Sequence, residues 1–180
     1  MYLRALSLVV PLLIGACALA VQSKNSAVAA PTAVFPIAPA KVGYGSTASS
    51  QATRMWSECV TAANAARRAA GAGPLQLEMR VAAAAAGHSA YQAQTQTMSH
   101  RGSGGSNAGI RLTAAGYTWT TWGENVAAGQ ADCETVLSGW LGSTTHRANI
   151  LNPAFRHIGI GMAMDVNGVP YWTMDLAAGG

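Results

Sequence analysis

The sequence predicts an α+β fold in which helices cover a β-sheet. Apolar residues recur at helical spacing in the first half of the domain, whereas the end of the chain alternates apolar with small or polar residues, as strands do. An Asn167-Gly168 pair separates the two alternating segments and is typical of a tight hairpin turn. Helices first and an antiparallel hairpin last are typical of α+β domains.

Two long helices open the domain. The first places five residues on one face and stops at Gly71-Ala-Gly-Pro74; the five are Trp56, Cys59, Val60, Ala63 and Arg67. The second runs from Leu77 to Tyr91 and is nearly all alanine in its middle, which suits close packing against another layer.

Shorter elements follow a glycine-rich loop at Ser99–Asn107. Helices are expected over 106–115, 131–141 and 146–151, the last with Thr145 as its N-cap. Strands are expected over 123–129, 157–165 and 171–176.

The first 16 residues have the features of an export signal. Arg4 precedes an apolar run of about 11 residues, which is too short to span a bilayer. Ile14-Gly-Ala-Cys17 resembles a bacterial lipobox and predicts lipidation of Cys17, whereas Ala18-Leu-Ala20 offers an alternative cleavage after residue 20. Both alternatives predict an extracytoplasmic protein, with membrane attachment through Cys17 in the first. Residues 17–53 are predicted to form a flexible tether, and 54–180 the domain.

Two cysteines remain apart from Cys17. An even pair in an exported chain predicts a disulfide between Cys59 and Cys133, with two buried thiols as the alternative.

Removal of Arg4 leaves ten basic residues against seven acidic ones. The basic residues are scattered apart from Arg67-Arg68, so the sequence gives no reason to expect nucleic-acid binding.

Three residues form the candidate site: His100, Glu124 and His146. Each is placed beside glycines, serines or a helix start rather than on an apolar helix face. The positive end of a helix disfavours imidazolium, so His146 is expected to be neutral. Two imidazoles and a carboxylate are a reasonable Zn²⁺ set that leaves one position open for water. The alternative is a polar network within a cleft.

An ordered set of motifs resembles the bacterial CAP (or SCP) domains, the cysteine-rich secretory, antigen 5 and pathogenesis-related group. The resemblance covers about residues 56–177 and rests on Asn64-Ala-Ala-Arg67, Gly73-Pro-Leu75, Ser99-His100, Gly116-Tyr117, Gly123-Glu-Asn-Val-Ala127, Trp140, His146-Arg-Ala-Asn-Ile-Leu-Asn152, Ile158-Gly-Ile-Gly161 and Tyr171-Trp-Thr173.

This resemblance implies a three-layer α-β-α sandwich with a central antiparallel sheet. It also implies a cleft lined by two histidines and two acids, of which His100, Glu124 and His146 match three. The second acid is missing after Trp140, and Ser143 is expected in its place. Of the other histidines, His88 is expected to be a packed or half-exposed helix residue and His157 to be exposed. Six residues match framework positions: Asn64, Arg67, Arg111, Asn125, Arg147 and Asn149.

Three functions follow as hypotheses. The first is a non-enzymatic envelope protein that binds a partner, lipid or divalent metal at the cleft, because one fold can serve many roles. The second is a metal-assisted hydrolase, in which zinc on the two histidines activates water and Glu124 acts as base or third ligand. The third is a lipid or sterol carrier, as the family resemblance implies.

Overall fold

The computed structural model describes residues 46–180, with side chains described from residue 54 onward. The predicted signal at 1–16, Cys17 and most of the predicted tether lie outside the described residues. The first helix begins at Ser46, so the helical part of the chain starts before the expected domain boundary at Arg54.

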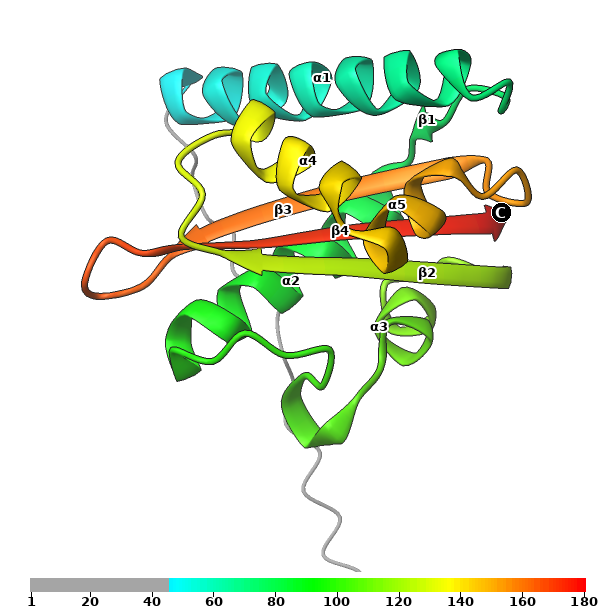
Figure 1. The fold of residues 1–180 in the computed structure, drawn as a ribbon. Coiled ribbons are helices and arrows are strands. Elements are labelled where there is room, and N and C mark those ends of the chain that lie inside the picture. The colour runs from blue at the N-terminus through cyan, green and yellow to red at the C-terminus, as the bar shows by residue number, and fades with distance from the viewer. Residues whose placement is uncertain (1–45) are drawn as a thin grey trace, which may run out of the picture. The chain divides into compact units, whose positions relative to one another are not determined.

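The domain has three layers, a sheet with helices on both faces (Figure 1). One face carries α1 (Ser46–Ala69), α4 (Cys133–Gly142) and α5 (Thr144–Leu151), and the other carries α2 (Met79–Thr95) and α3 (Ala108–Ala114). The sheet consists of β1 (Gln76–Leu77), β2 (Trp119–Ala128), β3 (His157–Met164) and β4 (Pro170–Gly179). The predicted three-layer α+β fold is confirmed.

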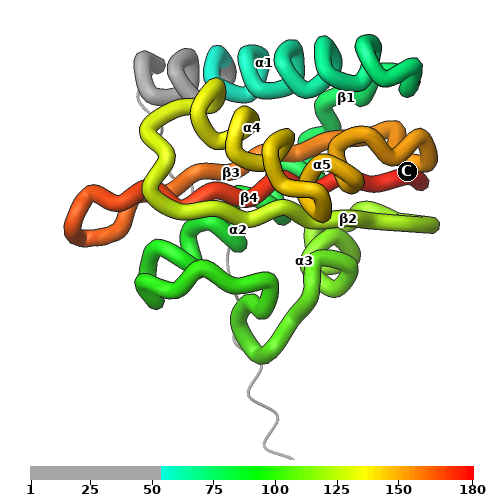
Figure 2. The backbone as a smooth tube through the Cα atoms, in the orientation of Figure 1, coloured from blue at the N-terminus to red at the C-terminus, as the bar shows by residue number. Residues whose placement is uncertain are grey.

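The strands lie in the order β1-β3-β4-β2, which leaves β2 at one edge (Figure 2). The three long strands are antiparallel, with β4 between β2 and β3. The short strand β1 was not predicted, and it pairs parallel to β3 through Gln76 and Leu77. A two-residue strand has no alternation to detect, so the sequence pattern could not reveal it.

The main hydrophobic core fills the space between the sheet and α1, α4 and α5. Ile158 and Ile160 of β3 enter it beside alternate residues of β4, which are Trp172, Met174 and Leu176. A disulfide joins Cys59 of α1 to Cys133 of α4, with the two Cα atoms 5.4 Å apart, and confirms that prediction. Both cysteines are buried in this core, so the bond links two helices of one layer.

On the other face, α2 packs directly against the backbone of β3. A Cβ atom at Gly159 would overlap the backbone of Val81 and Ala82, and one at Gly161 would lie 2.5 Å from the carbonyl carbon of Ala85. Glycine in the strand and alanine in the helix therefore allow this close approach, as the alanine-rich sequence predicts.

The remaining differences from the sequence analysis are local. Helix α5 begins at Thr144 with Ser143 as its N-cap, so the predicted N-cap at Thr145 was wrong. Ser143 makes no side-chain capping bond.

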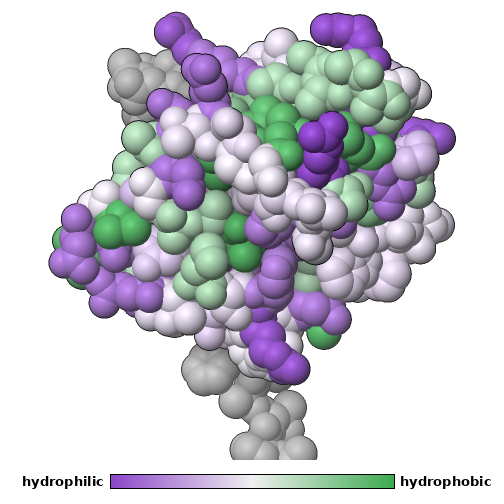
Figure 3. All heavy atoms as spheres, viewed as in Figure 1, coloured by the Kyte–Doolittle hydropathy of each residue, from purple (hydrophilic) through white to green (hydrophobic). Residues whose placement is uncertain are grey.

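None of the helices in the described part of the chain combines the length and apolarity needed to cross a bilayer. On the face shown in Figure 3, hydrophilic side chains are spread among apolar ones.

Candidate functional site

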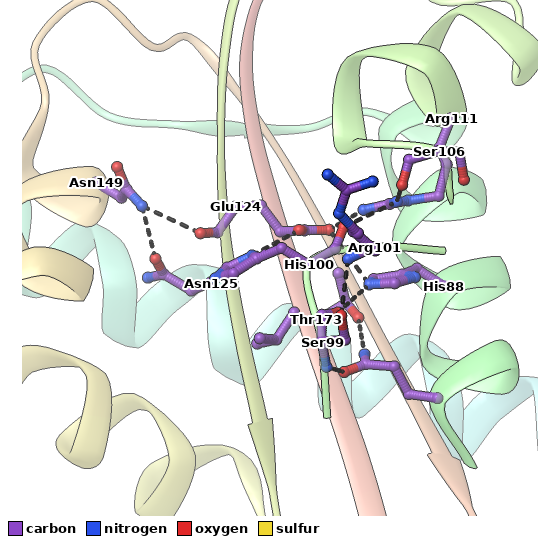
Figure 4. A network of polar contacts seen from close by, with 12 residues as sticks. His88, Ser99, His100, Arg101, Ser106, Arg111, Glu124, Asn125, Asn149 and Thr173 are labelled. Atoms are coloured by element: carbon purple, nitrogen blue, oxygen red, sulfur yellow. Dashed lines mark hydrogen bonds and ion pairs between the residues drawn. The ribbon is translucent and has the colours of Figure 1, made fainter. Parts of the chain in front are cut away.

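The candidate site is built around Glu124 on the edge strand β2. Successive side chains of a strand point to opposite faces, so Glu124 faces the α2–α3 layer while Asn125 faces α5 (Figure 4). The site therefore receives residues from both helical layers past the edge of the sheet.

The carboxylate of Glu124 is buried, and each of its two oxygens has a polar partner. Its Oε2 accepts a hydrogen bond from Nη2 of Arg111 on α3, and its Oε1 lies 2.8 Å from Nδ1 of His100. The Nε2 atom of His88, on α2, lies 3.8 Å from Oε2. The Glu124 side chain is 3% exposed whereas that of His100 is 60% exposed, so the histidine stands between the carboxylate and the solvent.

This contact fixes the tautomer of His100. An ionised carboxylate can only accept hydrogen bonds, so Nδ1 carries the proton and donates it to Glu124. In the neutral ring, Nε2 then keeps its lone pair. Arg111 also donates to the carbonyl oxygens of His100 at 3.3 Å and Ser106 at 2.8 Å, which ties the glycine-rich loop to the site.

His146 lies on α5, in the other helical layer. Burial, with a smaller effect of the charge of His100, lowers the pKa of His146. The neutral imidazole expected from its position at a helix start is therefore favoured, but burial is the main cause.

Two asparagines hold α5 against β2. Asn149 donates from Nδ2 to the carbonyl oxygen of Glu124 at 3.1 Å and to Oδ1 of Asn125 at 2.9 Å. Asn125 in turn donates to the carbonyl oxygen of His146 at 3.1 Å. These bonds fix the backbone at both Glu124 and His146, and they account for two of the framework positions.

A buried polar network lies beneath the site. Thr173 accepts hydrogen bonds from Ser89 and Gln92 of α2, each at 3.0 Å, and Gln92 accepts one from the backbone N–H of Ser99. His88 is fully buried and lies 2.7 Å from the carbonyl oxygen of Ser99, to which its Nε2–H donates. These contacts set the position of the loop that presents His100.

His88 agrees with one of its two expectations, whereas His157 does not agree with its expectation. His88 is packed, as one of the two expectations had it: its ring is stacked on that of Tyr91, and its Nε2 lies 3.8 Å from Oε2 of Glu124. His157 is half-buried and its Nδ1 lies 2.7 Å from the hydroxyl of Tyr117, so the expectation of an exposed ring was wrong. Tyr117 belongs to the smaller core beneath α2 and α3.

Sequence analysis missed Asp175, a second acid at the site. Asp175 is the cross-strand partner of Glu124 on β4, and its side chain is fully buried. Burial, reinforced by the charge of Glu124, raises the pKa of Asp175 well above its usual range. The available signal was the alternation of β4, which places Trp172, Met174 and Leu176 in the core and leaves an acid on the other face.

The contacts of Glu124 argue against its predicted role as a zinc ligand. Among residues 54–180, no three histidine, cysteine, aspartate or glutamate side chains are arranged to hold one ion. Both oxygens of Glu124 have partners, one of them the guanidinium of Arg111. Glu124 is therefore placed to orient His100 rather than to serve as a third ligand in a closed site.

A family model described as the cysteine-rich secretory protein family, CAP, matches residues 60–176. The chain therefore belongs to the CAP family. The matched region includes the His100–Glu124 contact and most of the sheet and helices, whereas α1 begins before it and β4 ends beyond it.

Two bacterial proteins resemble this chain in sequence or in structure. The uncharacterised protein YkwD of Bacillus subtilis is 30% identical over 126 residues, which make up 70% of this chain and 49% of YkwD. An extracellular SCP-domain protein of Bacillus anthracis has a similar structure, with a TM-score of 0.62 and 26% identity over 69% of this chain and 40% of that one. This chain thus spans about half the length of YkwD and less of the B. anthracis protein.

A more distant structure shows the same fold. An outer surface protein of Borrelia burgdorferi has a TM-score of 0.62 and 15% identity, over 73% of this chain and 94% of that protein. At this identity the likeness concerns the fold alone.

Proposed function

We propose that this chain is an extracytoplasmic CAP-domain protein that binds a ligand through His100 and His146 without catalysing a reaction. The contact between His100 and buried Glu124 carries the proposal. A carboxylate that holds Nδ1 presents Nε2 as an oriented donor atom, which is how carboxylates orient metal-ligating histidines. His146 supplies a second imidazole in which the neutral form is favoured.

Binding fits the site better than catalysis does. A general base needs a free lone pair within reach of the proton it removes. Glu124 is 3% exposed and accepts from both Arg111 and His100, so it is poorly placed to take a proton from water. The arrangement favours a fixed orientation of His100 over proton transfer through Glu124.

A divalent transition metal is the ligand to test first, with Zn²⁺ as the probe. Calorimetric titration of the purified mature protein should give saturable binding that His100→Ala and His146→Ala each abolish. His157→Ala is the matched control, since it removes a histidine that contacts Tyr117 outside the site, and it should bind zinc normally. Equal binding by wild type and both site variants would overturn the proposal.

Hydrolysis is the second candidate, because the lowered pKa of His146 also suits a base. Panels of peptide, ester and glycan substrates, with and without Zn²⁺, distinguish the two functions. We expect no turnover. Turnover that His146→Ala abolishes would establish the hydrolase instead.

Lipid carriage is favoured by one observation, an apolar groove of about 520 Å³ between α3 and the start of β2. Ile110, Trp119 and Trp122 line it, and Ile110 is 57% exposed. Extraction of the purified protein and mass spectrometry of the extract test this alternative. A stoichiometric lipid would support it over binding at the histidines.

The extracytoplasmic location is supported by the disulfide, which is typical of oxidising compartments, and by the extracellular description of the similar Bacillus anthracis protein. We further propose lipid attachment through Cys17 and an envelope component as the binding partner. Metabolic labelling with a fatty acid tests the attachment. Label that persists in Cys17→Ser would contradict it.

A further inference from the structure

Asp175 stands beside Glu124 on the sheet but is not used by the proposed binding site. The two residues are direct partners in the antiparallel pair of β2 and β4, so their side chains emerge on the same face. Directly opposed residues have Cβ atoms about 4.5–5.5 Å apart. Neither carboxyl oxygen of Asp175 has an assigned hydrogen-bond partner, although the residue is 0% exposed.

Counting charges shows which carboxyl group is neutral. Arg111 is the guanidinium that contacts Glu124, and burial lowers the pKa of the neighbouring His88, which favours its neutral form. One buried positive charge can balance one carboxylate but not two. Glu124 has the guanidinium and the donor of His100, whereas Asp175 has neither, so Asp175 is the group that keeps its proton.

We propose that Asp175 is a positioning residue for the ligand-binding site: as a carboxylic acid it donates a hydrogen bond to Glu124 and holds that carboxylate toward His100. The role of Asp175 in ligand binding rests on the proposed function, whereas its hydrogen bond to Glu124 does not depend on that function. Each oxygen of a carboxylate has two lone pairs, so Glu124 can accept this bond in addition to those from Arg111 and His100.

The order of contacts explains how a buried residue affects an exposed one. Asp175 fixes Glu124, Glu124 fixes Nδ1–H of His100, and the free Nε2 then faces the ligand. Without the donor of Asp175, the Glu124 carboxylate keeps Arg111 as its strongest partner and can turn away from His100. His100, 60% exposed, would then sample both tautomers.

The test uses the ring-nitrogen NMR signals of His100 in the full mature protein, assigned by their loss in His100→Ala. The wild type should show the Nδ1–H tautomer. Asp175→Ala should show a mixture of tautomers, and Asp175→Asn should restore the Nδ1–H form because its amide can also donate to Glu124. His157→Ala is the matched control on the same face of the sheet; it loses the contact with Tyr117 outside the site and should leave the tautomer unchanged.

Two results would overturn the proposal. One is an unchanged His100 tautomer in folded Asp175→Ala. The other is measured in the wild type, so it does not depend on whether a variant folds. Infrared spectra at neutral pH that lack a carboxylic-acid C=O band, identified by its shift in D₂O, would show that Asp175 is not a donor.

Zinc titration separates this inference from the proposed function. If both hold, Asp175→Ala should weaken zinc binding about tenfold, as for other residues that orient ligating histidines, and Asp175→Asn should not. If the wild type binds no zinc but Asp175→Ala still changes the tautomer, the proposed ligand fails and the positioning role remains.

Discussion

A single guanidinium holds three segments of the chain together. Arg67 on α1 is fully buried and donates to the carbonyl oxygens of four residues beyond its own helix. The acceptors and distances are Gly73 at 2.6 Å, Ile150 at 2.7 Å, Asn152 at 2.8 Å and Phe155 at 3.3 Å. The end of α1, the end of α5 and the loop before β3 therefore depend on one side chain.

Replacing Arg67 with Met should destabilise the domain by about 3 kcal/mol or more, because it leaves several buried carbonyl groups without a donor. Urea denaturation measures the change. Arg68→Met is the matched control, since Arg68 is exposed, and its free energy of unfolding should stay within about 0.5 kcal/mol of wild type. Similar midpoints for the two variants would contradict the structural role of Arg67.

His88 makes stability depend on pH. Burial is the main cause that lowers the pKa of His88 in the folded protein. At a pH between this lowered pKa and the ordinary pKa of 6.5, the unfolded chain binds a proton at His88 that the folded protein does not bind. Stability contributed by neutral His88 is therefore present above pH 6.5 and is lost as the pH falls.

Urea midpoints measured from about pH 7.5 down to about pH 5 test this effect. The wild type should lose stability more steeply than His88→Gln, whose amide can still donate to Ser99 but takes up no proton. Asp175 contributes in the opposite direction, since its raised pKa favours the folded state at low pH. The difference between the two proteins, rather than the wild-type curve, is therefore the quantity to compare, and parallel curves would argue against buried neutral His88.

At the scale of elements, α2 packs closely on β3 because Gly159 and Gly161 have no side chains. Gly161→Ala should destabilise the domain by several kcal/mol, because its Cβ would lie 2.5 Å from backbone atoms of Ala85 and Ala86, and a helix cannot give way as a flexible side chain can.

Gly87→Ala provides the contrast, on the helix α2 that packs against Gly161. Gly87 is exposed and an added Cβ there would contact nothing within 4 Å. Helix propensity then predicts a gain of about 0.5–1 kcal/mol. Thermal denaturation of the two variants should thus move in opposite directions. A neutral Gly161→Ala would show that α2 can move away from the sheet.

The elements also show what the sequence can predict. The helix and strand periodicities of α1, α2, β3 and β4 extend over several turns or alternations, and all four were predicted. By contrast, β1 is two residues long and is defined by its pairing with His157 and Ile158, far away in the chain. The start of α5 was missed by a small margin, because Ser143, Thr144 and Thr145 are all acceptable N-caps.

For the site, sequence analysis supplied the residue types but not their roles. His100 and Glu124 were singled out, and the structure places them 2.8 Å apart. The engagement of Glu124 by Arg111 and the burial of Asp175 opposite it depend on strand register, which local patterns do not encode. His88 could not be distinguished from an ordinary helix residue, because its partners come from β2 and the loop after α2.

For the whole molecule, the disulfide is the main covalent constraint within the described residues. Cys59 and Cys133 are 74 residues apart, and closing a loop of this size restricts the unfolded chain. In the chain-entropy model the stabilisation is about 4 kcal/mol. The urea midpoint of the protein should therefore fall markedly when a reductant is added.

Alkylation provides the independent check on this prediction. Cys59 and Cys133 should react only after reduction and unfolding, as read by intact mass. The Cys59→Ala, Cys133→Ala double variant should match the reduced protein and be insensitive to reductant. Equal midpoints with and without reductant would show that the bond contributes little.

The two imidazoles of the site are carried by elements of unequal stability. Helix α2, which supports the loop of His100, buries eight residues, whereas α5, which carries His146, buries only Ile150. Local opening that releases α5 should therefore need less free energy than opening of α2, and its amide protons should exchange with solvent sooner. A ligand held by both rings would bring those two rates closer together, so amide exchange of α5 would report occupancy of the site even when the ligand has no spectroscopic signal.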